Sequence, residues 1–318
     1  MHAILAVALS FVLVTAAPAL LLEPATRTVD ESLVIMVEAE GDYDECCIRL
    51  NTGAEIVDLP LEEYLVGVLF AEMPLSFHKE ALKAQAVAAR TFTAHRLDKP
   101  KHEMFDVCGD SHCCQAWCDY KSGEISDLDL YNTQTAVRET AGEVMTYGGD
   151  LIEAVYFSCS GGRTEAAVSV WGSEIPYLQS VISVNEIEAP RNASQVRVSI
   201  DEFSDTLVAL NSDVVLDGKA ENWIEEEERT SGGGISRIKL GGEWFSGTEL
   251  RKAFGLNSTL FTLSMVDKEI VFDVSGYGHR VGMSQYGADA MADLGADYQR
   301  ILQHYYTGIE LEKRSSLK

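Results

Sequence analysis

Apolar residues recur with a helical period in the segment before Pro74. Four of them occupy positions i, i+4, i+7 and i+8, which form one face of an α-helix: Leu61, Leu65, Val68 and Leu69. Asp58 is placed to cap this predicted helix, and Pro60 fits its first turn, where a missing N–H costs little. Pro74 ends the helix, because the residue before a proline disfavours the helical conformation.

The next position on this apolar face, i+11, is Glu72. Burial and the negative end of a helix dipole both oppose ionisation, so this position favours a protonated carboxyl group. A general acid needs that property. The alternative is a glutamate at a frayed helix end that reaches solvent, and structural carboxylates far outnumber catalytic ones.

The rest of the pattern predicts an α+β fold of mixed helices and antiparallel strands that form a cleft. A second, alanine-rich helix is expected from about Ser76 to Arg96, and its small side chains allow close packing. Alternating and β-branched segments predict strands. The further expected elements are strands at 33–38 and 48–59, a helix at 127–141, a hairpin around Gly148 and Gly149 within 143–157, and a helix that begins near Ala288.

Residues 185–265 differ in sequence pattern from the segments on either side, and this difference predicts a second, smaller lobe. They hold a helical segment at 201–211, an acidic run at Glu225–Glu228 that we interpret as a solvated face, and a short helix capped by Ser246 or Thr248. The domain hypothesis is therefore 1–24 signal or anchor, 25–32 linker, 33–184 catalytic lobe, 185–265 smaller substrate-grip lobe, and 266–318 return to the catalytic lobe.

Residues 3–22 form an uncharged apolar run that is long enough to span a bilayer as a helix. A secretory signal peptide is the alternative, and the small residues around Pro18 would suit a cleavage site. Both interpretations place the remaining chain outside the cytoplasm. We expect a single-pass N-terminal membrane anchor, or a secreted protein if the segment is cleaved.

The net charge of the chain limits the kinds of partner that it can bind. The chain has 318 residues and a formal net charge of −25. This charge argues against nucleic acid or an anionic membrane surface as the main partner. A neutral or cationic ligand suits it better.

Cysteine and histidine gather in a loop at 102–118. Four of the seven cysteines fall within it, and His102 and His112 lie beside them. One interpretation is a tetrahedral zinc site built from four nitrogen or sulfur ligands. The other is disulfide pairing with Cys46, Cys47 or Cys159, which is the default in an exported protein.

Two glycine-rich loops are candidates for ligand contact. One is SCSGGRTE at 158–165, which follows a predicted strand, and the other is GYGHRVGMSQYGA at 276–288. Glycines let the backbone approach a ligand closely, and loop side chains often carry function. His279 can equally be a packed structural histidine. Trp171 can stack on a sugar ring if it is exposed, or pack in the core.

Taken in order, five segments resemble the stage II sporulation protein D family, which also includes proteins called amidase enhancers. The resemblance runs from about residue 34 to 311. The segments are EEYLVGVLFAEMP with FHKEALKAQAVAARTFT, DVCGDSHCCQAW, FSCSGGRTEAAVSVWGSEIPYLQSV, TELRKAFGLNSTLF and GYGHRVGMSQYGADAMADLGADYQRILQHYYTGIEL.

The resemblance implies a membrane-anchored lytic transglycosylase that cleaves peptidoglycan glycan strands during sporulation. In this family the enzyme acts in forespore engulfment, on strands that a cell-wall amidase has stripped of stem peptides. Its partners would be that amidase and other engulfment proteins. No organic cofactor is implied.

The resemblance also implies roles for individual residues. Glu72 matches the family's catalytic glutamate, and Cys108 and Cys114 match its zinc-binding cysteine pair. His102, His112 and Cys113 are the candidates to complete a structural zinc site, since Cys113 stands where relatives usually have histidine. The candidate substrate-binding residues are Ser158, Ser160, Gly161, Gly162, Thr164, His279, Ser284, Gln285 and Tyr286. Arg280 replaces a small residue of the family motif, which could alter substrate fit near His279.

The expected reaction needs one carboxyl group. Glu72 would protonate the glycosidic oxygen between N-acetylmuramic acid and N-acetylglucosamine, and the muramyl C6 hydroxyl would attack C1 to close a 1,6-anhydro ring. Two other hypotheses remain open. One is a non-catalytic peptidoglycan-binding activator of a cell-wall amidase, and the other is zinc that activates water.

Overall fold

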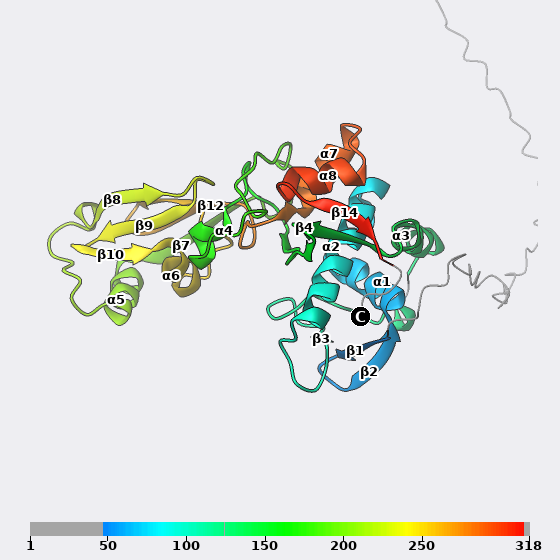
Figure 1. The fold of residues 1–318 in the computed structure, drawn as a ribbon. Coiled ribbons are helices and arrows are strands. Elements are labelled where there is room, and N and C mark those ends of the chain that lie inside the picture. Colours follow the sequence, from blue (N-terminus) through cyan, green and yellow to red (C-terminus); the bar gives the residue numbers. More distant parts are fainter. Residues whose placement is uncertain (1–46, 124, 315–318) are drawn as a thin grey trace, which may run out of the picture. The chain divides into compact units, whose positions relative to one another are not determined.

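The computed structural model describes residues 47–123 and 125–314, and Figure 1 shows their fold. The described residues belong to one compact unit. The apolar segment 3–22, the linker, the strand predicted at 33–38 and Cys46 lie outside them. Within the described ranges, none of the helices combines the length and the apolar character that crossing a bilayer requires.

Helices and small sheets alternate along the described chain. The helices are α1 (Leu61–Glu72), α2 (Lys79–Asp98), α3 (Asp127–Glu139), α4 (Ala167–Trp171), α5 (Ile200–Leu210), α6 (Gly247–Ala253), α7 (Gln285–Asp293) and α8 (Tyr298–Tyr305). The strands are β1 (Cys47–Asn51), β2 (Ile56–Pro60), β3 (Val107–Cys108), β4 (Glu143–Tyr147), β5 (Asp150–Leu151), β6 (Tyr156–Phe157), β7 (Ala193–Ser199), β8 (Ile224–Arg229), β9 (Ile235–Leu240), β10 (Glu243–Ser246), β11 (Phe261–Val266), β12 (Glu269–Ser275), β13 (Met283–Ser284) and β14 (Glu310–Lys313). The predicted mixture of helices with mainly antiparallel strands is confirmed.

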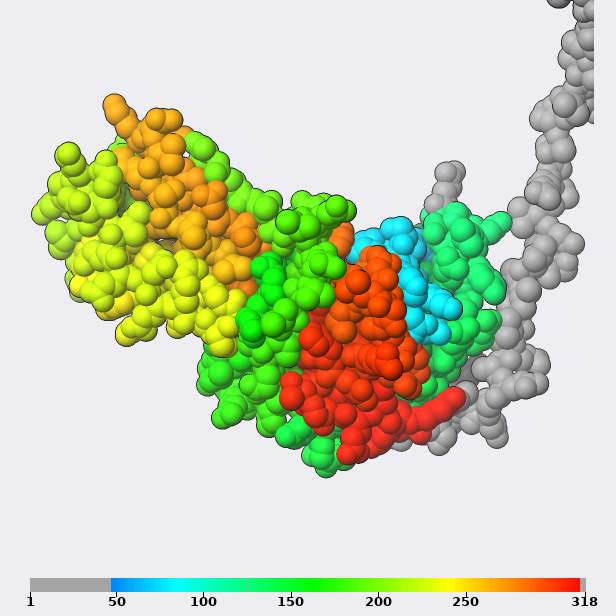
Figure 2. Space-filling view, turned by 90° about the horizontal axis from the view of Figure 1, so that it is seen from above, coloured from blue at the N-terminus to red at the C-terminus, as the bar shows by residue number. Residues whose placement is uncertain are grey.

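The first hydrophobic cluster is built around α2. This helix contacts α1, α3, α7, α8 and β4, so segments from both ends of the described chain pack on it. Its alanines Ala81, Ala84 and Ala88 are fully buried, which permits this close approach. Figure 2 shows the C-terminal segment, in orange and red, against the cyan segment that contains α2.

Helix α1 follows the sequence pattern, with one correction at its start. Leu61, Leu65 and Leu69 are at most 5% exposed, so the predicted apolar face is buried. Asp58 does not cap the helix, because it lies in β2 and Pro60 occupies the N-cap without a side-chain hydrogen bond. The helix ends where Met73 turns to an extended conformation, just before Pro74.

The start of α2 also differs from its prediction. The sequence predicts a start near Ser76, whereas the helix begins at Lys79 and His78 caps it by accepting a hydrogen bond from the Glu80 N–H. The His78 N–H donates to the carboxylate of Asp289 in α7, at 2.7 Å. A long-range contact thus sets where this helix begins.

The second hydrophobic cluster contains residues from Val198 to Val274. Its sheets are β8–β9–β10 and β7–β12–β11, both antiparallel, with α5 against β7 and β12 and α6 against β9 and β10. Ser246 caps α6 in a reciprocal capping box with Glu249, which decides between the two predicted caps. The acidic run Glu225–Glu228 lies in β8 and is exposed, as predicted.

Short parallel pairing joins the two glycine-rich loops. Strand β6 pairs with β13 in register Tyr156 to Met283 and Phe157 to Ser284. The predicted hairpin therefore consists of β4 and β5 only, and the chain after β5 leaves it to form β6. The SCSGGRTE loop begins directly after β6, and α7 begins directly after β13.

Candidate active site

Glu72 is the last residue of α1 and is partly exposed. Its carboxylate oxygen Oε1 accepts a 2.7 Å hydrogen bond from the Ala116 N–H, which comes from the cysteine-rich loop. This bond fixes the orientation of a side chain that the helix end alone would leave free. The carboxyl group is held in place while part of the side chain stays accessible.

Burial raises the pKa of Glu72 above its ordinary value of 4.5. The Ala116 N–H and the side chains of Gln285 and Tyr156 stabilise the charged form and partly oppose this effect. The net result is a carboxyl group that holds its proton to higher pH than an exposed glutamate does.

Tyr156 connects Glu72 to a buried polar network. Its hydroxyl donates to Gln115 at 2.9 Å, and the Gln115 amide donates to the Tyr64 hydroxyl at 3.2 Å and to Thr93 at 2.9 Å. Sequence reasoning assigned no role to Tyr156 or Gln115. Gln115 lies inside the segment DVCGDSHCCQAW, and Tyr156 directly precedes the segment that begins at Phe157, but nothing in their spacing indicates that they meet beside Glu72.

Gln285 reaches the same site from the first position of α7. It is only 5% exposed, and its amide nitrogen has no hydrogen-bond partner among the described residues. A buried donor without a partner is unusual, because it loses its hydration without compensation. Gln285 favours the charged form of Glu72 without a direct hydrogen bond to it. It therefore presents an N–H donor close to Glu72, at a position that the sequence predicts for substrate contact.

The other predicted hydroxyls lie inside the protein. Ser160, Thr164 and Ser284 are fully buried. Thr164 Oγ1 accepts from the Val181 N–H, and both serine hydroxyls donate to a carboxylate. Ser158 is partly exposed, and its carbonyl accepts from the Tyr286 N–H. Sugar contact through the buried hydroxyls stays a prediction.

The carboxylate that holds the two serines belongs to Glu186, which sequence reasoning missed. Glu186 is 4% exposed and accepts from Ser160 and Ser284. It lies in a polar stretch between Val184 and Ile187 that has no periodicity. No signal in the sequence distinguishes it from the exposed acids nearby.

In the SCSGGRTE loop Gly162 is exposed and Gly161 is partly exposed, like Ser158. The φ angles of Gly161 and Gly162 are +75° and +112°, which side chains disfavour. A Cβ at Gly161 would also approach Leu260 to 2.8 Å. Tyr286 is partly exposed as well, and its ring packs edge-on against Phe77 with centroids 4.9 Å apart.

His279 is held in its neutral form. Burial, together with the positive charge of Arg251, lowers its pKa to about 4. Its Nδ1 accepts from the Val281 N–H at 3.1 Å, and its ring packs against Phe157 and Trp171. No hydrogen bond joins His279 or Ser160 to Glu72 within the described residues, and Tyr156 lies beside both His279 and Glu72.

Trp171 lies at the end of α4, where Gly172 adopts a left-handed conformation and stops the helix. It is 43% exposed, and its ring lies 5.6 Å from that of His279. Of the two interpretations of this tryptophan, exposure favours sugar stacking. A partly exposed indole supported by a second ring offers a flat apolar face.

The Arg280 side chain is directed into the protein interior. It is fully buried and pairs with buried Glu165 at 3.1 Å. Its remaining N–H groups donate to the carbonyls of Ser160, Arg163 and Gly232. Its φ of +66° explains why a small residue suits this position. Arg280 thus acts on the SCSGGRTE loop from inside the protein.

The cysteine-rich loop gathers four of the five predicted metal ligands. One ligand atom each from His102, Cys108, Cys113 and Cys114 lies within 4.8 Å of the others. The fifth candidate, His112, is not in this group, because its side chain is 94% exposed and faces Asp110.

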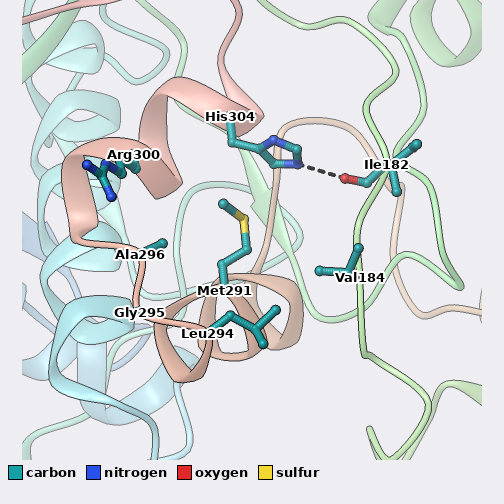
Figure 3. A pocket seen from close by; sticks show the side chains of 8 residues that line it. All are labelled: Ile182, Val184, Met291, Leu294, Gly295, Ala296, Arg300 and His304. Carbon is teal, nitrogen blue, oxygen red and sulfur yellow. Dashed lines mark hydrogen bonds between the residues drawn. The ribbon is translucent and has the colours of Figure 1, made fainter.

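A surface pocket of about 380 Å³ lies elsewhere, between α7, α8 and the segment around Ile182. Figure 3 shows its apolar wall and the 2.7 Å hydrogen bond from His304 Nε2 to the Ile182 carbonyl. The lining residues are Ile182, Val184, Met291, Leu294, Gly295, Ala296, Arg300 and His304. None of them is a predicted site residue.

Comparison with known proteins gives consistent results. A family model described as stage II sporulation protein matches residues 51–147. Stage II sporulation protein D of Bacillus amyloliquefaciens is 35% identical over 84% of this chain and 78% of its own length. Its counterpart in Bacillus subtilis is 35% identical over 83% of this chain and 77% of its own length. An amidase enhancer of Bacillus subtilis is 31% identical over 78% of this chain, but over only 40% of its own length.

Proposed function

The chain belongs to the stage II sporulation protein D family, and from this membership we propose that it is a peptidoglycan lytic transglycosylase. It cleaves the bond between N-acetylmuramic acid and N-acetylglucosamine in glycan strands and leaves 1,6-anhydro-muramyl ends. The observation that carries the proposal is Glu72, a positioned and partly accessible carboxyl group whose pKa is raised by burial.

Glu72 acts first as the acid. Its proton passes to the glycosidic oxygen as the bond from that oxygen to C1 breaks. The C6 hydroxyl of the same muramyl sugar attacks C1, and its proton returns to the Glu72 carboxylate. Because the substrate supplies the nucleophile, a second carboxylate is unnecessary. Within the described residues, no other acid hydrogen bonds with Glu72 or affects its pKa.

We expect substrate contacts from Gln285 beside Glu72, from the SCSGGRTE loop and from Trp171. The Gln285 amide has an unused donor for a sugar hydroxyl or an N-acetyl oxygen. The exposed backbone of Gly161 and Gly162 allows a glycan to lie close to the loop, and Trp171 offers a stacking face. The neutral His279 adds no charge that would attract a competing anion.

We propose a structural zinc ion at His102, Cys108, Cys113 and Cys114. Three sulfur atoms and one nitrogen are a donor set that zinc prefers, and four protein ligands close the site to water. Zinc bonds of about 2.0–2.3 Å separate tetrahedral ligands by roughly 3.5–3.8 Å. Since the ligand atoms lie within 4.8 Å of one another, the longest separation needs to contract by roughly 1.0–1.3 Å at most. The ion would stiffen the loop that carries the Ala116 N–H.

The wider setting is also part of the proposal. We propose that residues 3–22 anchor the chain in the cell membrane, with the site outside the cytoplasm. The substrate would be glycan strands that a cell-wall amidase has stripped of stem peptides, in engulfment during sporulation. The name amidase enhancer supports a role beside an amidase, and the name stage II sporulation protein D supports a role in sporulation.

The test is a product analysis. Purified glycan strands without stem peptides are incubated with wild type and with Glu72→Gln, and the ends are identified by mass spectrometry. We expect anhydro-muramyl ends from wild type and a loss of at least about 1,000-fold in the variant, because proton transfer loses its donor. Glu63→Gln, on the same helix but paired with Lys121, is the matched control and should cleave like wild type.

The same experiment tests the alternative. The likeness to an amidase enhancer favours a non-catalytic activator as the second candidate. If wild type leaves the strands uncut while it raises the rate of a purified cell-wall amidase, and Glu72→Gln does the same, the transglycosylase proposal is wrong.

A further inference from the structure

Glu186 accepts hydrogen bonds on both carboxylate oxygens although it is buried. Oε2 accepts from the Ser160 N–H at 2.6 Å, from the Ser160 hydroxyl at 2.6 Å and from the Gly161 N–H at 3.0 Å. Hydrogen bonds to an ionised acceptor are about twice as strong as those between neutral groups. One oxygen therefore fixes the turn at Ser160–Gly161.

The second oxygen fixes the start of α7. Oε1 accepts from the Ser284 hydroxyl and, at 2.6 Å, from the Ser183 hydroxyl, which also bonds with Tyr305. Ser284 is the N-cap of α7 and accepts from the Gly287 N–H. The cap and the SCSGGRTE loop thus share a single carboxylate.

Each of the two anchored segments carries a residue whose side chain lies beside Glu72. Gln285 follows Ser284, and Tyr156 lies in β6, four residues before Ser160. These are the two side chains that favour the charged form of Glu72. Glu186 itself makes no hydrogen bond with Glu72, so it acts on that carboxyl group only through the two segments.

Arg280 holds the same turn from the other side. Its Nε donates to the Ser160 carbonyl at 2.7 Å, while the Ser160 N–H donates to Glu186. The peptide groups on both sides of Ser160 are therefore bonded to buried charges. Such a turn has little freedom to adjust if one charge is removed.

We propose that Glu186 is a positioning residue of the Glu72 site, which holds the Ser160–Gly161 turn and the N-cap of α7 so that Gln285 and Tyr156 stay beside Glu72. The effect on cleavage rests on the transglycosylase function proposed above. The positioning role itself does not.

The test uses the full chain with Glu186→Ala, Glu186→Gln and the control Glu188→Gln, an exposed acid two residues away. Alanine leaves five donors facing Glu186 without their acceptor, whereas glutamine retains one oxygen for the backbone N–H groups and an NH2 group that the serine hydroxyls can accept. We expect large effects in Glu186→Ala, smaller effects of the same sign in Glu186→Gln, and none in Glu188→Gln.

Two readouts are independent of cleavage. Amide hydrogen exchange should become faster at Ser160, Gly161 and Gly287. The pKa of Glu72, followed by carbon NMR of labelled glutamate and assigned with Glu72→Gln, should rise, because Gln285 and Tyr156 no longer favour its charged form. The titratable groups that face Glu72 are Tyr156 from β6 and Tyr64 from α1, and both stay neutral over this range because burial raises their pKa values.

Cleavage provides the third readout. Displacement of groups at a reacting centre can cost up to about 100-fold in rate, and we expect a loss of this order in Glu186→Ala. Faster exchange without a change in the pKa of Glu72 would overturn the proposal, since it would make Glu186 a purely structural residue. If Glu186→Ala does not fold, an unchanged exchange rate and Glu72 pKa in Glu186→Gln would overturn it. Failure of wild type to cleave would refute the transglycosylase function and leave the first two readouts valid.

Discussion

Glu72 lies where a desolvated helix end meets a backbone donor. Burial disfavours the charged carboxylate, while the Ala116 N–H, Gln285 and Tyr156 favour it, and burial has the larger effect. The same contacts therefore orient the side chain and set its protonation. Because the folded state prefers the protonated form, stability and pH are linked at this residue.

The first prediction concerns Glu72→Gln. The folded protein holds the Glu72 proton more tightly than the unfolded chain, whose pKa is the ordinary 4.5. The resulting contribution to the free energy of unfolding is fully present below pH 4.5. It is lost as the pH rises through the pKa of the folded state. Glutamine mimics the protonated form and can accept the Ala116 N–H. We expect the variant to melt at a higher temperature than wild type at pH 7, and the difference to vanish by about pH 4.

Thermal unfolding monitored by circular dichroism from pH 4 to 8 measures this difference. Glu188→Gln, at an exposed position, is the control for the loss of one carboxylate elsewhere in the chain. A Glu72→Gln melting temperature equal to that of wild type at every pH would contradict the raised pKa.

At the scale of elements, the loop at 102–118 combines two tasks. It gathers His102 with three cysteines, and two residues after Cys114 it supplies the Ala116 N–H to Glu72. Sequence spacing suggested a metal site but left its ligands open. The backbone path favours Cys113 over His112, because it turns His112 outward and Cys113 inward.

The second prediction is that this loop binds one zinc ion per chain. Cys113→Ser should lose most of the metal, whereas His112→Ala, which changes an exposed side chain, should retain it. Metal analysis after dialysis against a weak chelator makes the comparison. Equal metal loss in both variants, or a wild type without zinc, would refute the proposed ligand set.

The third prediction belongs to α4, which carries Trp171. In a Glu72→Gln background, where strands should stay intact, Trp171→Ala should bind glycan oligosaccharides about 5- to 10-fold more weakly, or about 1–1.4 kcal/mol. Calorimetric titration measures the affinity. The control is Trp244→Ala, which removes a tryptophan that packs on Arg237 in β9. Equal losses in both variants would exclude a specific role for Trp171.

At the scale of the whole molecule, buried Glu165 and Arg280 connect the loop before β9 to the two glycine-rich loops. Glu165 accepts from Thr230 and from the Gly234 N–H, and Arg280 donates to the Gly232 carbonyl. Residues 230–234 adjoin the second hydrophobic cluster, whereas Val281 belongs to the first. The ion pair thus joins contacts from both clusters.

The fourth prediction is that Arg280→Ala destabilises the protein by about 3–5 kcal/mol, because Glu165 is left buried and unpaired. Arg280→Gly should be about 1 kcal/mol more stable than the alanine variant, since glycine tolerates the φ of +66°. Urea unfolding measures both. Arg237→Ala, whose pair with Glu228 is exposed, should change stability little. An alanine variant as stable as wild type would contradict the role of the ion pair.

The sequence alone determined the features that depend on neighbouring residues. The helical period placed Glu72 at the end of a buried face, and Pro74 ended the helix there, because periodicity and proline act over a few residues. A helix cap at Ser246 or Thr248, the exposed acidic run and the family motifs were readable for the same reason. The density of Cys and His in one loop likewise indicated a candidate metal site, but not which residues would be its ligands.

Only the tertiary structure decided which distant groups meet. Ala116 reaches Glu72 across 44 residues, Glu186 reaches Ser284 across 98, and Arg280 reaches Ser160 across 120. No local sequence pattern encodes these pairs. A buried charged side chain needs a partner, but the partner can come from any part of the chain that packing brings next to it. The buried state of Ser160 and Ser284, the exposure of His112 and the shared carboxylate of Glu186 follow from how the chain folds back on α2.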